Sequence, residues 1–203
     1  MEFFAWLDQL DKNIFTAIQE QLGVEWLDSA MLLLRNATTW IPLYLFVLIW
    51  IFKNASPHAV SFIVLTIITF AFCDFVSASV LKPLVGRLRP CYDTDVASSV
   101  RGLIGCGGRF SFPSSHAANH FGLATFWFLA IRHVTGKRWL WLWLWAASVC
   151  FAQVYVGKHF PLDVLGGALL GVLAGLLAAS VFKNWQPRWF KQQRGSKFAK
   201  TAY

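Results

Sequence analysis

The sequence predicts an all-α fold, a polytopic transmembrane helical bundle of about five to six spans preceded by an N-terminal amphipathic helix. Of the 203 residues, 57% are hydrophobic and 14% are charged, whereas a soluble domain carries roughly a quarter charged residues. Apolar runs long enough to cross a bilayer recur along the chain, and basic residues collect at their ends. No linker or long repeat divides the chain, so we expect one membrane-embedded domain over residues 1–203.

Residues 1–25 are expected to form an amphipathic helix that lies in the membrane interface. Apolar residues from Phe3 to Leu22 recur mostly at helical spacing, with Asp8, Asp11 and Lys12 among the polar residues between them. Because acidic residues interrupt this segment, it lacks the apolar core and the small-residue cleavage site of a signal peptide. The first true span must then direct insertion.

Five apolar runs follow and qualify as spans, roughly residues 39–52, 59–81, 115–131, 139–156 and 162–182. The first run is short, so it needs the apolar residues 30–34 before it to reach the thickness of a membrane. The fourth run opens with alternating Trp and Leu, which leaves no polar face. A helix that enters through an aromatic belt therefore explains this run better than a strand.

Lysine and arginine residues set the orientation of the bundle. In a five-span arrangement Lys53, the basic loop after the third run and the basic tail 183–203 fall on one side, which is cytoplasmic by the positive-inside rule. The acidic N-terminal segment and the loop 83–114 then lie outside. We therefore expect a multi-pass protein of the plasma (inner) membrane whose loop 83–114 faces the periplasm or exterior. This topology explains the net charge of +8, so no nucleic-acid partner is expected.

Three clusters of polar residues meet at the outer ends of the spans. They read Lys82-Pro-Leu-Val-Gly-Arg87-Leu-Arg89-Pro90, then Phe112-Pro-Ser114-Ser115-His116, then Gln153-Val-Tyr-Val-Gly-Lys158-His159-Phe-Pro-Leu-Asp163. Convergence of Lys, Arg, Ser and His on one rim predicts an anion site. A phosphoryl group in transit carries negative charge on its equatorial oxygens, which Lys82, Arg89 and the Ser114 hydroxyl are able to stabilise.

The two histidines of the clusters can do covalent chemistry on such an anion. A neutral imidazole at His159 can attack phosphorus if a carboxylate holds its tautomer and stabilises the cation that forms. Asp163 is four residues further on, and a helical turn that begins near Pro161 would place it beside His159. His116 is the candidate to protonate the departing oxygen, since the ordinary pKa of histidine is about 6.5.

The clusters resemble the three motifs of the type 2 phosphatidic acid phosphatase family, which run K-x6-R-P, P-S-G-H and S-R-x5-H-x3-D. The resemblance spans residues 82–163, with Ser115 in the place of the family's Gly. It implies a membrane lipid phosphatase that works without a metal, so no cofactor is expected. It also implies the following roles: nucleophile for His159, orienting partner for Asp163, general acid for His116, and phosphate ligands for Lys82, Arg89 and Ser114.

The third motif departs from the family pattern, because Ala152 and Gln153 replace its Ser-Arg pair. Loss of a phosphate-binding guanidinium costs about 2 to 4 kcal/mol if nothing replaces it. Gln153 can still donate a neutral hydrogen bond, and Lys158 or Ser115 can supply part of the stabilisation. On a continuous helix Lys158 lies about 140° from Gln153, so it can substitute directly only if the helix breaks near Gly157.

Other polar residues have simpler interpretations. Asp74 lies within the second run and is expected to hydrogen-bond a neighbouring helix. Arg87 has no motif role and is expected to be an anchor at the membrane surface, while His120 fits either substrate contact or helix packing. Asp93 and Asp95 lack a third ligand, so a solvated loop explains them better than a metal site.

Two further patterns concern cross-links and packing. Cys91 and Cys106 both fall in the predicted outer loop, where an oxidising compartment permits a disulfide, and the sequence leaves open whether it forms. Gly167, Gly171 and Gly175 recur every four residues, which favours close helix packing inside the bundle, with dimerisation as the alternative. A monomer or a weak homodimer is therefore expected.

The leading hypothesis is hydrolysis of a phosphate or pyrophosphate group from a lipid at the outer leaflet. The expected partners are the lipid bilayer and a phospholipid or polyprenyl phosphate substrate, from the classes polyprenyl diphosphate, phosphatidylglycerol phosphate, phosphatidic acid or lipid A. A lipid-to-lipid phosphotransferase would use the same motifs. A catalytically weak phospholipid-binding or transport protein is the alternative that Gln153 raises.

Overall fold

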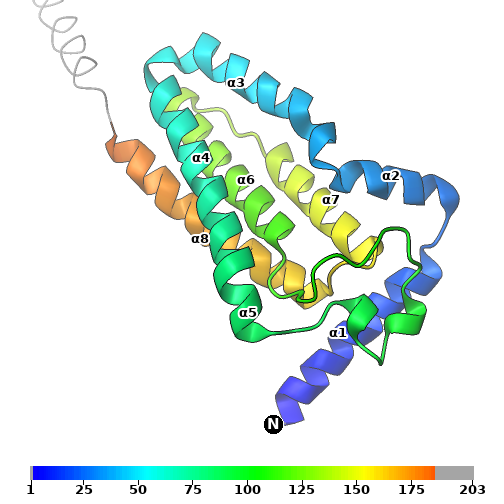
Figure 1. Ribbon diagram of the computed structural model, residues 1–203. Helices are drawn as coiled ribbons and strands as arrows, with labels where there is room; N and C mark the ends of the chain where they lie inside the picture. Colours follow the sequence, from blue (N-terminus) through cyan, green and yellow to red (C-terminus); the bar gives the residue numbers. More distant parts are fainter. Residues whose placement is uncertain (1, 186–203) are drawn as a thin grey trace, which may run out of the picture.

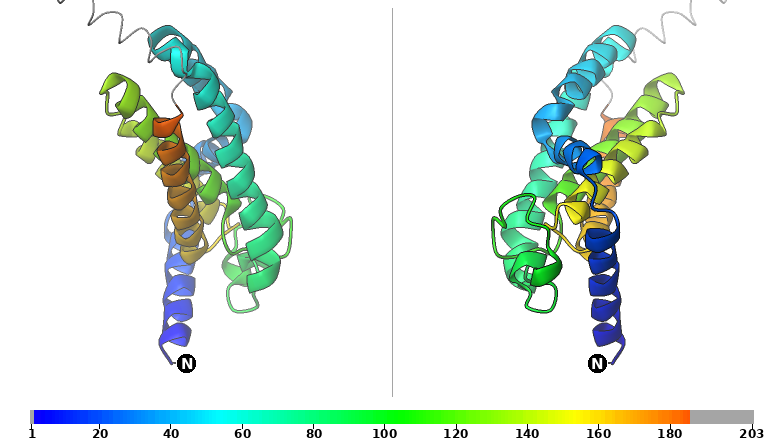
Figure 2. Two further views of the ribbon diagram at one scale, coloured as in Figure 1. Left: turned by 90° about the vertical axis from the view of Figure 1, so that its left-hand side faces the viewer. Right: turned by 90° about the vertical axis from the view of Figure 1, so that its right-hand side faces the viewer.

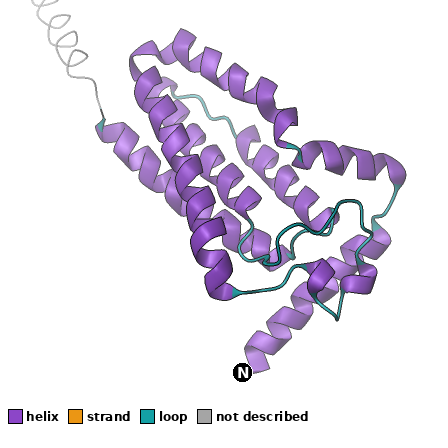
Figure 3. Ribbon diagram, viewed as in Figure 1, coloured by secondary structure: helices purple, strands orange, loops and turns teal. Residues whose placement is uncertain are grey.

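The computed structural model describes residues 2–185. Within that range the chain is helical (Figure 1, Figure 3), apart from loops and an isolated β-bridge between Leu88 and Phe110. The helices are α1 (Glu2–Gln21), α2 (Glu25–Arg35), α3 (Ile41–Ala55), α4 (Ala59–Phe75), α5 (Lys82–Val85), α6 (Ser115–Thr135), α7 (Trp141–Tyr155) and α8 (Pro161–Asn184). The predicted all-α fold is confirmed. The predicted basic tail 183–203 lies, from residue 186 onward, outside the described residues.

Two helical stretches of the described chain are long and apolar enough to cross a membrane. They are Ala37–Val85, with 49 residues, and Pro161–Asn184, with 24. The first contains α3 and α4, which meet at a sharp corner near Ala55 (Figure 1), where the backbone leaves helical geometry at φ −149° and ψ 41°. Pro57 lacks the amide proton that would continue the helix past this corner. The predicted count of five to six spans is not confirmed.

The start of the first span differs from the prediction. Residues 30–34 do not extend it but belong to α2, a separate helix. Asn36 ends α2 in an extended conformation, and its side chain accepts a hydrogen bond from the Thr38 amide at 3.1 Å, which starts a short 3-10 turn before α3. A side-chain cap of this kind competes with continuation of the helix. Apolar composition alone does not reveal it.

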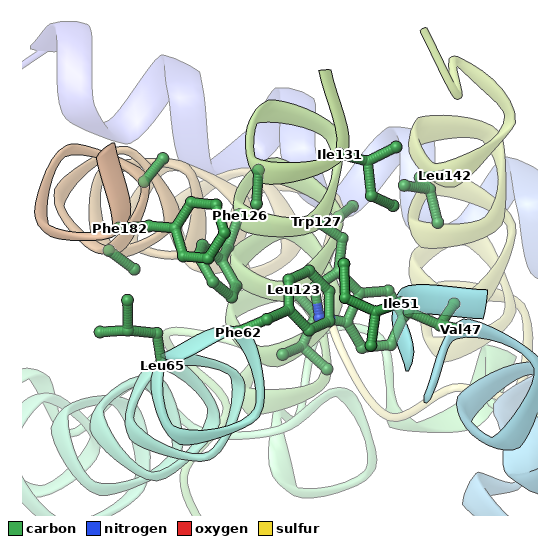
Figure 4. Packing of buried hydrophobic residues seen from close by; sticks show 14 of the residues in the cluster. Val47, Ile51, Phe62, Leu65, Leu123, Phe126, Trp127, Ile131, Leu142 and Phe182 are labelled. Carbon is green, nitrogen blue, oxygen red and sulfur yellow. The ribbon is translucent and has the colours of Figure 1, made fainter. Parts of the chain in front are cut away.

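The apolar core surrounds the C-terminal half of α6 and draws on α3, α4, α7 and α8. Phe62 stacks on Phe126 with ring centroids 5.3 Å apart, and Phe182 meets Phe126 edge to face at 5.8 Å (Figure 4). Trp127 and Trp145 are stacked at 5.8 Å. Because α6 runs through this packed cluster, the core fixes the position of its N-terminal end and of the polar residues there.

The helices α6 and α8 are in backbone contact. A Cβ atom at Gly167 or Gly171 would overlap a backbone carbonyl oxygen of α6, and one at Gly175 would lie 2.6 Å from the Cβ atom of Thr125. The predicted close packing through these glycines is therefore confirmed within the bundle. It brings the N-terminal ends of the two helices side by side.

The N-terminal helix α1 lies across the end of the bundle that carries the loop 83–114, and its first turns extend beyond the other helices (Figure 2). Phe3 and Phe4 are exposed, whereas Asp11, Phe15 and Gln19 are buried. The helix thus packs on the bundle through a face that includes polar residues. Its location in the membrane interface stays a prediction.

Candidate active site

A polar cavity of about 300 Å³ lies where the predicted motif residues meet. Its walls come from α2, α5, α6, α7 and two loops, and consist of Arg35, Lys82, Arg89, Gly107, Ser115, His116, Gln153, Lys158 and His159. Of the predicted site residues, Asp163 and Ser114 do not line it. Arg35 also lines the cavity, and no motif in the sequence predicts it there. No aspartate or glutamate of residues 2–185 lines the cavity.

His159 lies in the turn between α7 and α8. The turn is possible because Gly157 adopts a left-handed backbone with φ +77°, and the predicted break in the helix occurs there. The Nδ1 atom of His159 lies 3.6 Å from Oδ2 of Asp163, just beyond hydrogen-bond distance. Burial lowers the pKa of His159, against the opposing effect of the Asp163 carboxylate. The imidazole is therefore neutral near pH 7, the form that can attack phosphorus.

The Asp163 carboxylate is fully buried and held by two donors. Its Oδ2 accepts a hydrogen bond from the Phe160 amide at 2.8 Å, and its Oδ1 accepts one from Nη1 of Arg87 at 2.9 Å. Its backbone carbonyl accepts from the Ser114 amide at 2.9 Å, which ties the start of α8 to the start of α6. The carboxylate therefore has a fixed position beside His159.

Arg87 is not the membrane anchor that we expected. Its guanidinium reaches Asp163 and also forms ion pairs through Nη2 with Asp11 at 2.8 Å and Asp8 at 3.0 Å. It lies over the ring of Phe160, 4.3 Å from the centroid. The sequence of α1 contains an indication of this contact: Asp8 and Asp11, three residues apart, share one face of the helix and need a cation. Sequence alone does not show which cation approaches them.

Asp11 joins α1 to the site in a second way. Its Oδ1 accepts a hydrogen bond from the Leu162 amide at 2.9 Å, so an acid of α1 caps the N-terminus of α8. Burial raises the pKa of Asp11, against the opposing effects of that amide and of Arg87. The N-terminal helix is therefore part of the support of the site.

Ser115, rather than Ser114, presents its hydroxyl to the cavity. The Ser115 Oγ accepts hydrogen bonds from Nζ of Lys82 at 3.0 Å and from Oγ of Ser77 at 2.9 Å, which leaves its own proton for a ligand. Ser77 lies in the widened π-helical turn Val76–Leu81, which precedes Lys82. The Ser114 hydroxyl instead caps α6 by accepting from the Ala117 amide at 3.4 Å.

Two further polar residues on helices have structural roles. The Nδ1 atom of His120 lies 2.8 Å from the His116 carbonyl oxygen, and its ring meets Trp145 with centroids 5.0 Å apart. His120 does not line the cavity, so helix packing is the correct one of its two interpretations. Asp74 accepts a hydrogen bond from Asn119 of α6 at 3.2 Å, which confirms its predicted contact with a neighbouring helix.

The ammonium of Lys158 is held by the loop 83–114. It donates to the carbonyl oxygens of Gly105 and Cys106, the second at 2.7 Å, and a disulfide joins Cys106 to Cys91 across the loop. Burial lowers the pKa of Lys158, and the positive charges of Arg89 and Arg35 lower it further. Lys158 therefore contributes charge to the cavity, but at least two of its donors are already used.

The acids of the outer loop form ion pairs with α1. Asp93 and Asp95 lie 3.1 and 2.7 Å from the ammonium of Lys12; the Asp95 side chain is 67% exposed, as a solvated loop predicts, whereas the Asp93 side chain is largely covered. Within residues 2–185, no three His, Cys, Asp or Glu side chains come together in a group that could hold a metal ion. The contacts of Lys12 fasten the outer loop to α1.

The fold and the site together define a helical membrane protein in which a buried histidine–aspartate pair adjoins a cationic cavity. The model of the PAP2 superfamily matches residues 58–187, well over half of the chain. The chain belongs to this superfamily.

Relatives and a solved structure agree with this membership. The chain is 38% identical over 143 residues to the lipid A 4′-phosphatase of Bacteroides thetaiotaomicron, a match that covers 68% of this chain and 62% of that protein. It is 27% identical over 187 residues to the lipid A 4′-phosphatase of Porphyromonas gingivalis, covering 89% and 76%. The PAP2-type phosphatidylglycerolphosphate phosphatase of Bacillus subtilis has a similar fold, with a TM-score of 0.70, 21% identity and coverage of 90% and 89%.

Proposed function

We propose that this chain is an integral-membrane lipid phosphatase that hydrolyses a phosphate monoester or a diphosphate through a phosphohistidine intermediate. The proposal rests mainly on one observation. His159, buried and neutral, lines a cavity whose other polar side chains are four cations, the second histidine His116, the Ser115 hydroxyl and the Gln153 amide, and the fixed Asp163 carboxylate lies behind it. Such a site suits a dianion that is attacked by an imidazole.

In the proposed reaction, His159 attacks through Nε2, because its Nδ1 faces Asp163. The phosphorus–nitrogen bond forms as the bond from phosphorus to the lipid oxygen breaks, and His116 donates its proton to that oxygen. Water then attacks the phosphohistidine, gives a proton to His116 and restores neutral His159, with phosphate as the second product. Asp163 stabilises the imidazolium character of His159 in both steps.

Lys82, Arg89 and the hydroxyl of Ser115 are proposed to stabilise the negative charge on the phosphate. Arginine suits bidentate contact with a phosphate, and lysine acts as a point charge. His116 lines the same cavity as these cations, and their positive charge opposes its protonation. The bound anion offsets that charge, so His116 takes up its proton when the anion binds. Ser114 acts through its cap of α6, which aims Ser115 and His116 at the cavity.

The first candidate substrate is a lipid of the lipid A class, because both relatives described above carry that name. Polyprenyl diphosphate, phosphatidylglycerol phosphate and phosphatidic acid are the other members of the panel to be tested. The site is proposed to face the periplasm or exterior of the plasma (inner) membrane. The oligomeric state that we propose is a monomer or a weak homodimer.

The test is phosphate release from this lipid panel by the purified protein in detergent. His159→Ala is expected to abolish turnover, whereas His133→Ala, at the other end of α6, serves as the matched control. Brief incubation with radiolabelled substrate should label the wild-type chain with an acid-labile, base-stable phosphate. Mass spectrometry of the lipid products separates hydrolysis from transfer to a lipid acceptor. Full turnover by His159→Ala would refute the proposed chemistry.

A further inference from the structure

Arg35 is the one residue of the cavity wall that comes from α2. It ends this helix and lines the same cavity as Gln153. The other half-buried arginines of residues 2–185 have partners, since Arg87 and Arg101 form ion pairs and Arg89 donates to a carbonyl oxygen. Arg35 has no ion pair and no side-chain hydrogen bond within that range, and its Nε is buried without a partner.

A second donor without a partner faces the same cavity. The Nε2 atom of Gln153 is buried and has no hydrogen-bond acceptor among the described residues, although Gln153 is only 1% exposed. Buried donors that lack an acceptor are costly, by about 1 to 3 kcal/mol each. Two of them on one cavity wall are satisfied together by an anion that accepts from both.

The position of Arg35 is fixed by contacts that the preceding turns of α2 make. Met31, one helical turn earlier and on the same face, packs in a cluster with Ala152 and Tyr155 of α7. Asp28 accepts hydrogen bonds from the Tyr155 hydroxyl at 2.6 Å and from Arg101 at 2.7 Å, which pins α2 to α7 and to the outer loop. These contacts place the end of α2 against the part of α7 that carries Gln153.

The charge around Arg35 also requires an anion. Lys82, Arg89 and Lys158 line the same cavity, and no carboxylate of the described chain does. A favourable interaction with the C-terminal end of the α2 dipole explains why an arginine is tolerated at this position, but it does not neutralise four cations around one cavity. A phosphate dianion offsets two of these four charges and also supplies the missing acceptors.

We propose that Arg35 binds the substrate phosphate in place of the arginine that the third motif lacks. The guanidinium that the family pattern places on α7 is supplied here from α2, and it shares the non-bridging oxygens with Gln153. Arg35, rather than Lys158, then supplies most of the charge that the missing arginine would provide. The ammonium of Lys158 already donates hydrogen bonds to the outer loop. This inference rests on the proposed phosphatase function.

The test compares Arg35→Gln, Arg35→Lys and Arg35→Gln combined with Gln153→Arg. Arg132→Gln, which removes an exposed arginine at the other end of α6, is the matched control. Arg35→Gln is expected to lower kcat/KM by about 100- to 1,000-fold, as for loss of one transition-state donor. It should weaken inhibition by orthovanadate by at least about tenfold, while the thermal stability of the protein is retained. Arg35→Lys should fall between, and Gln153→Arg should restore most of the loss, because it returns the guanidinium to α7.

Two results would overturn the role of Arg35. One is unchanged kcat/KM in Arg35→Gln. The other is a loss of activity with unchanged orthovanadate affinity and no rescue by Gln153→Arg, which would show that Arg35 acts only on the fold. Absence of phosphatase activity in the wild-type protein would defeat the proposed function, whereas the binding of orthovanadate or inorganic phosphate to the same variants would still decide whether Arg35 is an anion ligand.

Discussion

Replacement of Arg87 by glutamine tests the support of the histidine–aspartate pair. The guanidinium bridges Asp163 and Asp11, both of which are buried, so its loss leaves two carboxylates without their counter-charge. Removal of one partner from a buried ion pair costs about 3 to 5 kcal/mol. The Arg87 side chain is 18% exposed, and water screens part of the interaction, so we expect a loss of about 3 kcal/mol in the free energy of unfolding.

The variant should also lose activity, because Asp163 keeps one of its two donors and no longer holds His159 in a fixed orientation. We expect kcat to fall by about 10- to 100-fold, as for other residues that orient a reactive group. Stability is measured by unfolding in detergent followed by tryptophan fluorescence, and kcat by phosphate release. Arg87→Lys should be intermediate, since one ammonium cannot donate to both carboxylates in the geometry of the guanidinium fork.

A double-mutant cycle separates this role from a general loss of surface charge. Asp11→Asn keeps an acceptor for the Leu162 amide but removes the charge that Arg87 contacts. The effects of Arg87→Gln and Asp11→Asn should therefore be non-additive, whereas Arg87→Gln and Arg132→Gln should add. Wild-type stability and kcat in Arg87→Gln would refute the reasoning.

Four other outcomes are expected. Burial lowers the pKa of His159, so the imidazole stays neutral and activity should persist as the pH falls through 6.5. The contribution of this shift to the free energy of unfolding is complete above pH 6.5 and is lost as the pH falls from 6.5 through the folded pKa. Asp163→Asn removes the charge that raises this pKa and should move the acidic limb of the kcat/KM profile further down while kcat falls; an upward shift would contradict the pairing. Lys158→Ala should loosen the outer loop, seen as faster proteolysis there, and lower activity more than Arg132→Gln does; a silent Lys158→Ala would mean that the loop contacts are dispensable. Chelator should leave activity intact, and strict dependence on an added divalent metal would refute the phosphohistidine mechanism.

Local patterns along the chain predicted several features of the fold. The four-residue spacing of His159 and Asp163, with Pro161 between them, predicted a pair across the first turn of a helix, and the structure places them 3.6 Å apart. The glycines at four-residue intervals predicted close helix packing inside the bundle, and the structure shows that packing between α8 and α6. Both predictions depend on helical periodicity, which is a short-range property of the backbone.

The ends of individual helices were harder to predict from the sequence. The apolar residues 30–34 looked like the beginning of a span, but the cap at Asn36 ends α2 and starts a new turn. Hydropathy reports the environment of a segment, whereas a helix end depends on hydrogen bonds between a side chain and the backbone amides that follow it. For this reason hydropathy does not distinguish α2 as a separate helix and does not place Arg35, at its end, in the site.

Sequence by itself determined the membrane character of the chain, the helical class and the three motifs with His116, His159 and Asp163, because each of these is written in composition or in short spacings. Tertiary structure alone decided which cations join the site besides those of the motifs. Arg87 meets Asp163 at a separation of 76 residues, and Arg35 reaches a cavity whose other residues begin at Lys82. Charge acts through space and not along the chain, so the partner of a buried carboxylate or the substitute for a missing arginine becomes visible only when α1 and α2 are packed against the bundle.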